Sequence, residues 1–385
     1  MPKLIRITTV PIALKYLLTG QMRMMKESGF DVIMISADGP ERDEVIKQED
    51  CPHIIVPMTR KITPFRDLQC LLKLVRIFRK EKPDIVHTHT PKAGLLGMLA
   101  AKFAKVPLRI HTVAGLRFIT SSGFTRWVLI RMEKWTYRSA THIWPNSFSL
   151  LRFLEQNKMA GKKKLNVIGN GSSNGIDLKR FSFEALKPSI LEQAKQQMKY
   201  DPSLIYFLAV GRIVRDKGVE ELLDVFTKLY ASHPRLRLAM VGSFEEHLDP
   251  LSDDAKKILH DHPGIIHIPW SERVEYFMHL SSALIHASHR EGFPNVLLQA
   301  GAMKCPVICS GIDGNMDIIE HQKTGLIFEA KNKHELLQQL ETAIKEPIIL
   351  KHYAQNLRQR IEQYFDQREL QLRLKKEYMK LLSSK

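Results

Sequence analysis

The sequence lacks any long stretch of uncharged apolar residues. No run approaches the roughly 18 residues that suggest a membrane-spanning helix, and the opening stretch MPKLIRITTVPIALKYLLTG has neither the apolar core nor the small-residue cleavage site of a signal peptide. We therefore expect a chain that stays in the cytoplasm. With 385 residues and 44% hydrophobic content, it is long enough for two domains with separate cores.

Cysteine is also scarce, and its spacing does not suit zinc. The four residues Cys51, Cys70, Cys305 and Cys309 form no CxxC pair and have no nearby histidine at a zinc-binding spacing. We expect buried, reduced thiols. The sequence also has no Asp-x-Asp motif, which a metal-bridged diphosphate would normally require, so we expect neither a metal nor another bound cofactor.

Negative charge is scarce in the first half of the chain. Residues 1–180 contain 31 Lys and Arg against 14 Asp and Glu, whereas residues 181–385 contain 27 of each, so the first half carries the whole net charge of +17. This excess of positive charge in the first half of the chain predicts an anionic partner, which could be lipid headgroups, a phosphate-bearing substrate or nucleic acid.

Two series of apolar strands alternate with helices along the chain. The first series has strands expected at 3–10, 30–36, 84–90, 108–114 and 142–147. The second has strands expected at 204–213, 236–243, 265–270, 282–288, 306–311 and 325–330, followed by a tail that we expect to be helical throughout 333–382. This alternation predicts two parallel, doubly wound sheets, with a boundary between Phe181 and Tyr200 and ligands at the carboxyl ends of the strands.

Two cations follow the first strand of the second series. No GxGxxG motif follows any expected strand, so an ordinary dinucleotide-binding site has little support. Instead, the stretch VGRIVRDKG places Arg212 just beyond a strand end, directly after Gly211, and Lys217 ahead of a helix. Two such cations can bind a diphosphate and stabilise the charge of a departing one. A solvated turn is the alternative interpretation.

The stretch HASHREGFPNVLLQAGA forms a second candidate site. We expect a strand, a loop that contains Arg290 and Glu291, and a helix with Pro294 in or near its first turn. The free amides between Gly292 and Val296 would face an incoming anion. Because a carboxylate repels a diphosphate, we expect Glu291 to accept hydrogen bonds from sugar hydroxyls instead. The alternative is a simple charge at the helix N-terminus.

Together these segments resemble glycosyltransferase family 4, a group of retaining enzymes with the GT-B fold. The resemblance rests on GRIVRDKG, REGFPNVLLQA and IDGNMDIIEHQKTGLIF, and in the first half on PDIVHTHTPKAGLLGMLAA, RIHTVAGL and NGSSNGIDLKRF. It is strongest to bacterial capsule and lipid-linked-oligosaccharide members. It implies an α/β architecture of two Rossmann-like, doubly wound domains facing a central cleft. We expect an acceptor-binding domain over 1–185, a nucleotide-sugar-binding domain over 186–365, and a C-terminal helix over 366–385 that packs back on the first domain.

The resemblance also implies roles for individual residues. Arg212 and Lys217 would bind the donor diphosphate, Glu291 would contact the transferred sugar, and His111 would hydrogen-bond the donor sugar and support the reacting centre. The residues expected to bind the substrate are Gly211, Arg212, Lys217, Glu291, Gly292, Phe293, Pro294, Asn295, Val296 and Gln299. His87 and His89 are weaker candidates, because a histidine on an apolar strand is more often a core residue.

Gln299 departs from the family pattern, which usually has a second glutamate there to bind the nucleotide ribose. Glutamine can accept a hydrogen bond from one hydroxyl and donate to another, so we expect a retained but altered ribose contact. The segment NGSSNGID is also longer than the usual form. The geometry of the strand that leads out of the first domain therefore stays open.

The implied reaction moves a hexose or N-acetylhexosamine from a nucleotide sugar, UDP by family habit, to a polyprenyl-diphosphate-linked or other saccharide acceptor. It implies front-side attack with retention, in which a phosphate oxygen takes the proton of the acceptor. The basic helices expected at 60–82 and 123–140, the second with Trp127 and Trp135, can lie in anionic headgroups. We expect peripheral association with the inner face of the cell membrane, and a core-facing apolar stripe is the alternative.

Three other functions stay open at this point. An epimerase on the same architecture would also bind a nucleotide sugar, but it would not need the basic lobe. A nucleic-acid-binding protein is favoured by charge alone, since no nucleic-acid fold signature is present, and we expect no nucleic acid partner. A scaffold with a decayed site is opposed by the intact Arg212, Lys217 and Glu291.

Overall fold

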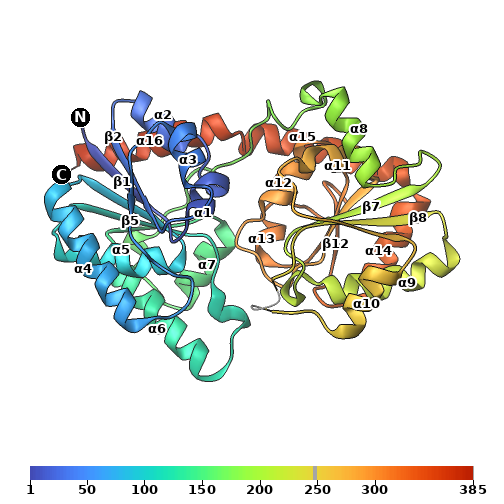
Figure 1. The fold of residues 1–385 in the computed structure, drawn as a ribbon, viewed down its shortest axis with the longest axis horizontal. Helices are drawn as coiled ribbons and strands as arrows, with labels where there is room; N and C mark the ends of the chain where they lie inside the picture. Colours follow the sequence, from blue (N-terminus) through green and yellow to red (C-terminus); the bar gives the residue numbers. More distant parts are fainter. Residues whose placement is uncertain (246–248, 385) are drawn as a thin grey trace. The chain divides into compact units, whose positions relative to one another are not determined.

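The computed structural model describes residues 1–245 and 249–384 and divides into two compact units. Unit 1 contains Met1–Asn174 and Gln367–Lys385, and unit 2 contains Gly175–Asp366. Each unit is built on one six-stranded sheet with helices on both faces (Figure 1). All strand pairs in both sheets are parallel, which confirms the predicted doubly wound architecture.

Unit 1 has the strand order β3-β2-β1-β4-β5-β6. Its strands are β1 (Lys3–Ile7), β2 (Asp31–Ser36), β3 (His53–Ile55), β4 (Ile85–His89), β5 (Leu108–Val113) and β6 (His142–Pro145). Its helices are α1 (Pro11–Leu17), α2 (Gln21–Glu27), α3 (Arg42–Glu49), α4 (Pro64–Glu81), α5 (Pro91–Phe103), α6 (Gly123–Ser139), α7 (Phe148–Gln156) and α16 (Gln367–Ser383), with short 3-10 turns η1 (Arg117–Thr120) and η2 (Lys162–Lys164).

The two faces of the unit 1 sheet bury different cores. Successive side chains of a strand point to opposite faces, so Ile5 and Ile7 of β1 pack with residues of α4, α5 and α7, whereas Leu4 packs with residues of α1, α2 and α16. Both faces are apolar because both are covered by helices. Each fully buried aliphatic side chain contributes roughly 1.5–3 kcal/mol.

Unit 2 has the strand order β12-β11-β10-β7-β8-β9. Its strands are β7 (Ile205–Val210), β8 (Leu236–Val241), β9 (Ile265–Ile268), β10 (Ala283–His286), β11 (Val307–Ser310) and β12 (Leu326–Phe328). Its helices are α8 (Pro188–Gln197), α9 (Val219–Ser232), α10 (Asp253–Asp261), α11 (Val274–Leu280), α12 (Asn295–Ala302), α13 (Asp313–Met316), α14 (Lys333–Lys345) and α15 (Pro347–Tyr364), with turns η3 (Phe183–Ala185) and η4 (Arg215–Lys217).

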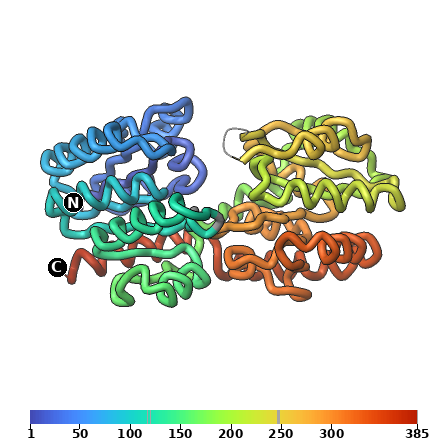
Figure 2. The backbone as a smooth tube through the Cα atoms, turned by 90° about the horizontal axis from the view of Figure 1, so that it is seen from below, coloured from blue at the N-terminus to red at the C-terminus, as the bar shows by residue number. Residues whose placement is uncertain are grey.

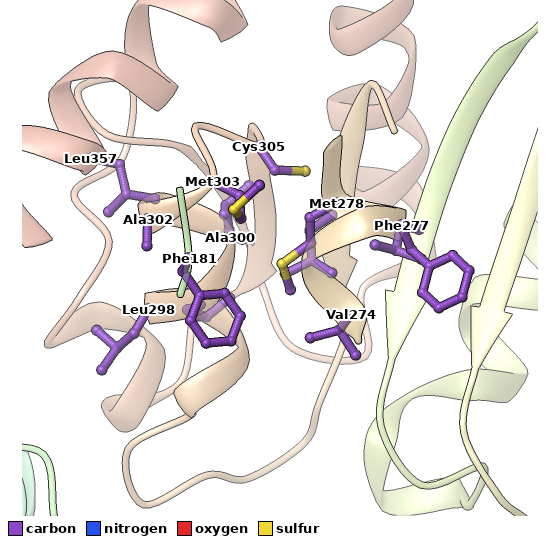
Figure 3. Close-up of a cluster of buried hydrophobic side chains, with 14 of the residues drawn as sticks. Phe181, Val274, Phe277, Met278, Leu298, Ala300, Ala302, Met303, Cys305 and Leu357 are labelled. Carbon is purple, nitrogen blue, oxygen red and sulfur yellow. The ribbon is translucent and has the colours of Figure 1, made fainter. Parts of the chain in front are cut away.

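The core of unit 2 on one face of the sheet lies under α8, α11, α12 and α15. Figure 3 shows part of it, to which Phe181, Met278 and Leu298 are contributed by three separate segments. The other face is covered by α9, α10 and α14, with Phe207 of β7 buried against them. Side chains of Ser147, Ser252 and Asn332 cap the N-termini of α7, α10 and α14 and satisfy amides there.

The two units divide at Asn174 and Gly175, earlier than the boundary expected at 185/186. The physical reason is packing: Ile176 and Phe181 are buried in the core of unit 2, and the amide of Ile176 donates to the carbonyl of Phe365 at 2.9 Å. Residues 175–185 therefore belong to the second unit, although they precede its first strand.

The C-terminal tail is three helices and not one continuous helix. Pro347 starts α15, because proline cannot donate the hydrogen bond that would continue α14. A second break at Phe365 and Asp366 separates α15 from α16. Helix α16 belongs to unit 1, where it contacts α2, and Figure 2 shows this red segment among the blue and green ones. None of the helices in the described part of the chain is long and apolar enough to cross a membrane.

Candidate functional site

The site lies where the chain order of the unit 2 sheet reverses. Strand β7 pairs with β8 on one side and with β10 on the other. The connections that leave β7 and β10 therefore run to opposite sides, and the carboxyl ends of these two strands flank a crevice of the kind that binds ligands in open α/β sheets. Lys217 follows β7 and Glu291 follows β10, so the topology brings together two residues that are 74 positions apart.

The loop after β7 is pressed against the end of β10 at Gly218. This glycine has φ +67°, and a Cβ atom built on it would lie 2.1 Å from the carbonyl oxygen of Ala287. A side chain would therefore both strain the backbone and push the two loops apart. Glycine at this position is what allows Lys217 to approach the loop that follows β10.

Arg290 ties the loop after β10 to the loop after β7. Its Nη2 lies 2.9 Å from Oδ2 of Asp216, and the amide of His289 donates to the carbonyl of the same residue at 2.9 Å. Ser288 also donates to that carbonyl, at 3.2 Å. Arg290, which precedes a buried helix, thus links the loop after β10 to the loop after β7.

Glu291 is paired with Lys217. The Lys217 ammonium contacts Oε1 of Glu291, and Nε2 of His286 lies 3.3 Å from the same oxygen, although it lacks the geometry of a hydrogen bond. Burial alone would raise the pKa of Glu291, but the adjacent Lys217 charge and the His286 ring outweigh burial and hold that pKa well below its usual range. Both protein partners lie on Oε1, so within the described chain Oε2 is left to accept a hydroxyl.

Arg212 lines the same small cavity as Lys217 and His286. The cavity volume is about 30 Å³, enough for water and too small for a nucleotide, so a larger ligand would have to lie over the loops. Nη1 of Arg212 lies 2.8 Å from Oε2 of Glu245, and Nη2 lies 3.8 Å from Oδ1 of Asp216. Burial lowers the pKa of Arg212, but Glu245 and Asp216 outweigh it, and the net direction is upward.

The segment after Glu291 offers backbone groups more than side chains. Pro294 is the N-cap of α12, and helix α12 begins at Asn295. The Phe293 side chain is buried in the core against Phe365, with ring centroids 5.4 Å apart, and Val296 packs on the same core. Gly292 is buried as well. The candidate donors of this segment are the first backbone amides of α12, as at the anion-binding ends of other helices, and the side-chain amide of the partly buried Asn295.

Gln299 lies one helical turn further along α12 and is only partly buried. Its side-chain amide makes no hydrogen bond to another residue of the described chain, so both its oxygen and its nitrogen are open to a ligand. The ribose contact expected of this residue stays a prediction.

His111 lies in unit 1, on β5. It is 2% exposed, and its Nδ1 lies 2.8 Å from Oγ1 of Thr88. Burial lowers the pKa of His111 to about 4, so the ring is neutral at neutral pH. It also packs against α5, where a Cβ on Gly94 would lie 2.4 Å from Cε1 of the ring.

His87 and His89 are both buried in unit 1, where His87 belongs to a hydrogen-bonded network and Nε2 of His89 has no hydrogen-bond partner among the described residues. Nδ1 of His87 lies 2.5 Å from the hydroxyl of Tyr378, and its Nε2 lies 2.7 Å from Oγ1 of Thr112. The ring of His89 stacks on His87, with centroids 4.2 Å apart. These contacts fit the role of core histidines, which the sequence favoured for them.

Three site residues were not identified from the sequence: His286, Asp216 and Glu245. Each of them lies beside a site residue that the sequence did predict, but none of them belongs to a motif of its own. Asp216 stands inside the RDKG stretch, so its position beside Lys217 was the one available signal. The four cysteines are buried as free thiols. Across the described residues, no group of three or more His, Cys, Asp or Glu side chains is arranged to hold a metal ion.

Comparison with known families matches both halves of the chain. The family "Glycosyl transferase 4-like domain" matches residues 17–171, and "Glycosyl transferases group 1" matches residues 192–366. The capsular polysaccharide biosynthesis glycosyltransferase CapM of Staphylococcus aureus is 35% identical over 351 residues, which cover 91% of this chain and 90% of CapM.

Two more distant proteins extend the comparison. An Escherichia coli enzyme described as UDP-Gal:alpha-D-GlcNAc-diphosphoundecaprenol alpha-1,3-galactosyltransferase is 23% identical over 353 residues, 90% of this chain and 88% of that enzyme. The crystal structure of HepE from Anabaena, in complex with UDP and glucose, superposes with a TM-score of 0.81 at 18% identity and covers the whole of both chains. The chain is thus a glycosyltransferase that belongs to family 4 and has the GT-B fold.

Proposed function

We propose that the chain transfers a hexose or N-acetylhexosamine from a UDP-sugar to a polyprenyl-diphosphate-linked or other saccharide acceptor, in the assembly of a surface polysaccharide such as a capsule. The observation that carries the proposal is the Lys217–Glu291 pair at the reversal point of the unit 2 sheet. The names of CapM and of the E. coli galactosyltransferase support the acceptor class, and the UDP complex of HepE supports the donor. None of these comparisons supports an epimerase or a nucleic-acid-binding protein.

In this proposal the bound donor replaces the contact between Lys217 and Glu291, and each of the two residues then contacts the donor instead. The diphosphate takes the Lys217 ammonium and the Arg212 guanidinium, with the α12 amides beside them, and these donors stabilise the charge that develops on the leaving UDP. Glu291, released from Lys217, accepts a hydroxyl of the sugar. Nε2 of His286, 3.3 Å from Oε1 of Glu291, stays beside the carboxylate during the exchange.

The reaction is proposed to proceed with retention and without a metal. The acceptor hydroxyl attacks the anomeric carbon from the side on which the diphosphate leaves. A bond forms between the anomeric carbon and the acceptor oxygen as the bond between that carbon and the diphosphate oxygen breaks. A phosphate oxygen of the leaving UDP takes the acceptor proton. His111, neutral at the pH of the reaction, is proposed to hydrogen-bond the donor sugar.

Unit 1 is proposed to dock on the inner face of the cell membrane through α4 and α6. On α4, Phe65, Leu68 and Leu72 are 87%, 55% and 49% exposed. On α6, Phe124, Trp127 and Trp135 are 79%, 54% and 54% exposed among basic residues. Cations interleaved with exposed aromatic residues suit anionic headgroups. Each helix also has a core-facing side, with Leu74 of α4 and Tyr137 of α6 in the core of unit 1, so the exposed residues are additional to the core-facing stripe.

The test is a thermal-shift screen of nucleotide sugars, followed by transfer of a radiolabelled sugar to a lipid-linked acceptor in the presence of EDTA. We expect a UDP-sugar to give the largest shift, transfer to survive EDTA, and NMR of the product to show the anomeric configuration of the donor. Transfer with inversion, or transfer that stops with EDTA and resumes with a divalent cation, would contradict the proposed mechanism. Absence of transfer with every lipid-linked acceptor would contradict the acceptor class.

A further inference from the structure

A hollow in unit 1 is lined by eight residues, of which four are positively charged and none is acidic. It lies between the C-terminal half of α6 and the segment that connects α7 to η2, and it has a volume of about 390 Å³, within the range of small-molecule sites. We call it the basic pocket. Its lining residues are Lys134, Tyr137, Arg138, Lys158, Met159, Ala160, Gly161 and Lys164.

The cations of the basic pocket have no acidic partners. No carboxylate lines the pocket, and among the described residues no Asp or Glu side chain pairs with Lys134, Arg138, Lys158 or Lys164. Glu133, which precedes Lys134 in sequence, is 9% exposed, and burial raises its pKa to about 7, so it carries only part of its charge at neutral pH. Four cations around one hollow repel each other, and a bound anion would relieve that repulsion.

Lys164 has a structural role that the other three cations lack. Its ammonium donates to the carbonyls of Tyr137 and Ala140, at 3.1 and 2.6 Å, and so caps the C-terminus of α6. Burial lowers the pKa of Lys164, and the neighbouring Arg109 and Lys102 lower it further. Lys134, Arg138 and Lys158 make no such contacts, so helix capping does not explain their convergence.

The basic pocket continues an exposed aromatic and basic stripe along α6. Phe124 stacks on Trp127 with ring centroids 5.8 Å apart, and the Arg131 guanidinium lies over Trp127 at 5.2 Å. Trp135 follows one turn later, next to Lys134 and one turn before Arg138. Tryptophan is typical of the headgroup level of a bilayer, where phosphate groups are also found.

We propose that the basic pocket binds a phosphate group, held by Lys134, Arg138 and Lys158 with Lys164 beneath it, and that a lipid headgroup at the membrane surface supplies this phosphate. The inference goes beyond the proposed reaction, because no residue of the basic pocket belongs to the unit 2 site. It gives unit 1 a specific headgroup contact in addition to general attraction between opposite charges.

The test compares two kinds of vesicle with the full-length chain and no nucleotide sugar. Vesicles of an uncharged, phosphate-free glycolipid carry phosphatidic acid in one set and, in the other, a sulfated lipid that gives the same measured surface potential. We expect about tenfold tighter binding to the phosphatidic acid vesicles, the size of effect given by one or two charge-assisted hydrogen bonds. The variant Arg138→Gln/Lys158→Gln should lose this preference.

The matched control is Lys162→Gln/Lys163→Gln, which removes the same charge from exposed positions of η2 outside the pocket lining. It should bind both kinds of vesicle more weakly and keep the preference between them. Pyrophosphate in solution, measured by calorimetry, distinguishes a free phosphate from a lipid: pocket binding of pyrophosphate with no lipid preference would support the site and overturn the lipid source. Equal behaviour of the pocket variant and the control with both probes would overturn the proposal. Failure of sugar transfer has no bearing on either measurement.

Discussion

The two units have the same strand order, but they differ in the side chains at the carboxyl ends of the two central strands. These side chains are neutral in unit 1 and charged in unit 2. In each, the first and fourth strands of the unit lie side by side at the reversal point. In unit 1 the ends of β1 and β4 are joined by neutral hydroxyls, with Oγ1 of Thr9 lying 2.8 Å from Oγ1 of Thr90. In unit 2 the ends of β7 and β10 carry Lys217 and Glu291. Topology therefore places equivalent strand ends side by side in both units, and the loop residues decide what those ends can bind.

Charge separates the two units just as sharply. Unit 1 contains 35 Lys and Arg against 15 Asp and Glu, a balance of +20, while unit 2 contains 23 against 26, a balance of −3. The unit proposed to bind an anionic diphosphate is thus the one with no excess of positive charge. Local placement of Arg212, Lys217 and helix amides, and not the overall field, would bind the donor, whereas the field of unit 1 suits a charged surface.

The largest expected effect comes from breaking the charged site of unit 2. Replacing Lys217 or Glu291 with alanine should remove about 2.7–4 kcal/mol of transition-state stabilisation, a hundred- to thousandfold loss in kcat/KM. Steady-state transfer assays measure it. Lys333→Ala is the matched control, since Lys333 forms a comparable but exposed ion pair with Asp224 and should leave kcat/KM unchanged. Activity kept by both site variants would refute the assignment of the site.

The second prediction compares alanine substitutions at two glycines that have positive φ, one in each unit. Gly218→Ala would place a Cβ 2.1 Å from the Ala287 carbonyl oxygen, whereas Gly123→Ala, at φ +55°, meets nothing within 4 Å. Both changes should cost about 1–2 kcal/mol from the left-handed backbone, and only Gly218→Ala should add a clash and a loss of transfer. Denaturant unfolding measures the loss of stability, and kcat/KM measures the loss of transfer. Equal losses in both variants would show that the loop contact at Gly218 does not matter.

The third effect is a shift in acid stability. The pKa of Glu291 is lower in the folded chain than its ordinary value, so its ionisation stabilises the fold above about pH 4.5 and this contribution is lost as pH falls through the folded pKa. In Lys217→Met the burial remains and the cation is gone, so the folded pKa of Glu291 should rise to or above its ordinary value, and the loss of stability on acidification should become smaller or reverse. Thermal unfolding between pH 3 and 7, with Lys333→Met beside it, measures the shift in the acid limb. An unchanged acid limb in Lys217→Met would contradict the charge pairing.

The smallest expected effect on the enzyme itself lies on the surface of unit 1. Trp127→Ser/Trp135→Ser should leave folding and transfer to a soluble acceptor unchanged, because both side chains are 54% exposed. Binding to anionic vesicles should weaken by about tenfold, from the apolar area lost at the interface. Vesicle sedimentation measures it. The exposed unit 2 change Trp270→Ser is the control, and an equal loss there would mean that α6 has no special part in docking.

Much of the fold could be predicted because local patterns determine it. The near-continuous apolar runs predicted buried parallel strands, and the motifs around Arg212 and Glu291 identified the family, which the comparisons confirm. The short strand β3, with all of its residues partly exposed, gave no such pattern and was not predicted. The tail expected to be helical over 333–382 is helical apart from two short breaks, and its division into α14, α15 and α16 follows Pro347 and the break at Phe365 and Asp366.

The roles of the site residues stay predictions, although the structure shows which of them meet. Lys217 and Glu291 form a pair that no local pattern could reveal, since their contact depends on β7 lying beside β10. His286 was overlooked because a histidine inside an apolar strand has no signature of its own. The exposure of Trp127 and Trp135, which the sequence left open, depends on which face α6 turns to the sheet.

The sequence by itself determined the two sheets, the family and the uneven distribution of charge, because apolar periodicity, motif spacing and composition are properties of neighbouring residues. Only the tertiary structure decided that residues 175–185 join unit 2 and that Lys217 and His286 both lie against Glu291. The physical reason is that burial and ion pairing act between residues distant in the chain, and their partners are fixed only when the strands have paired and the helices have packed.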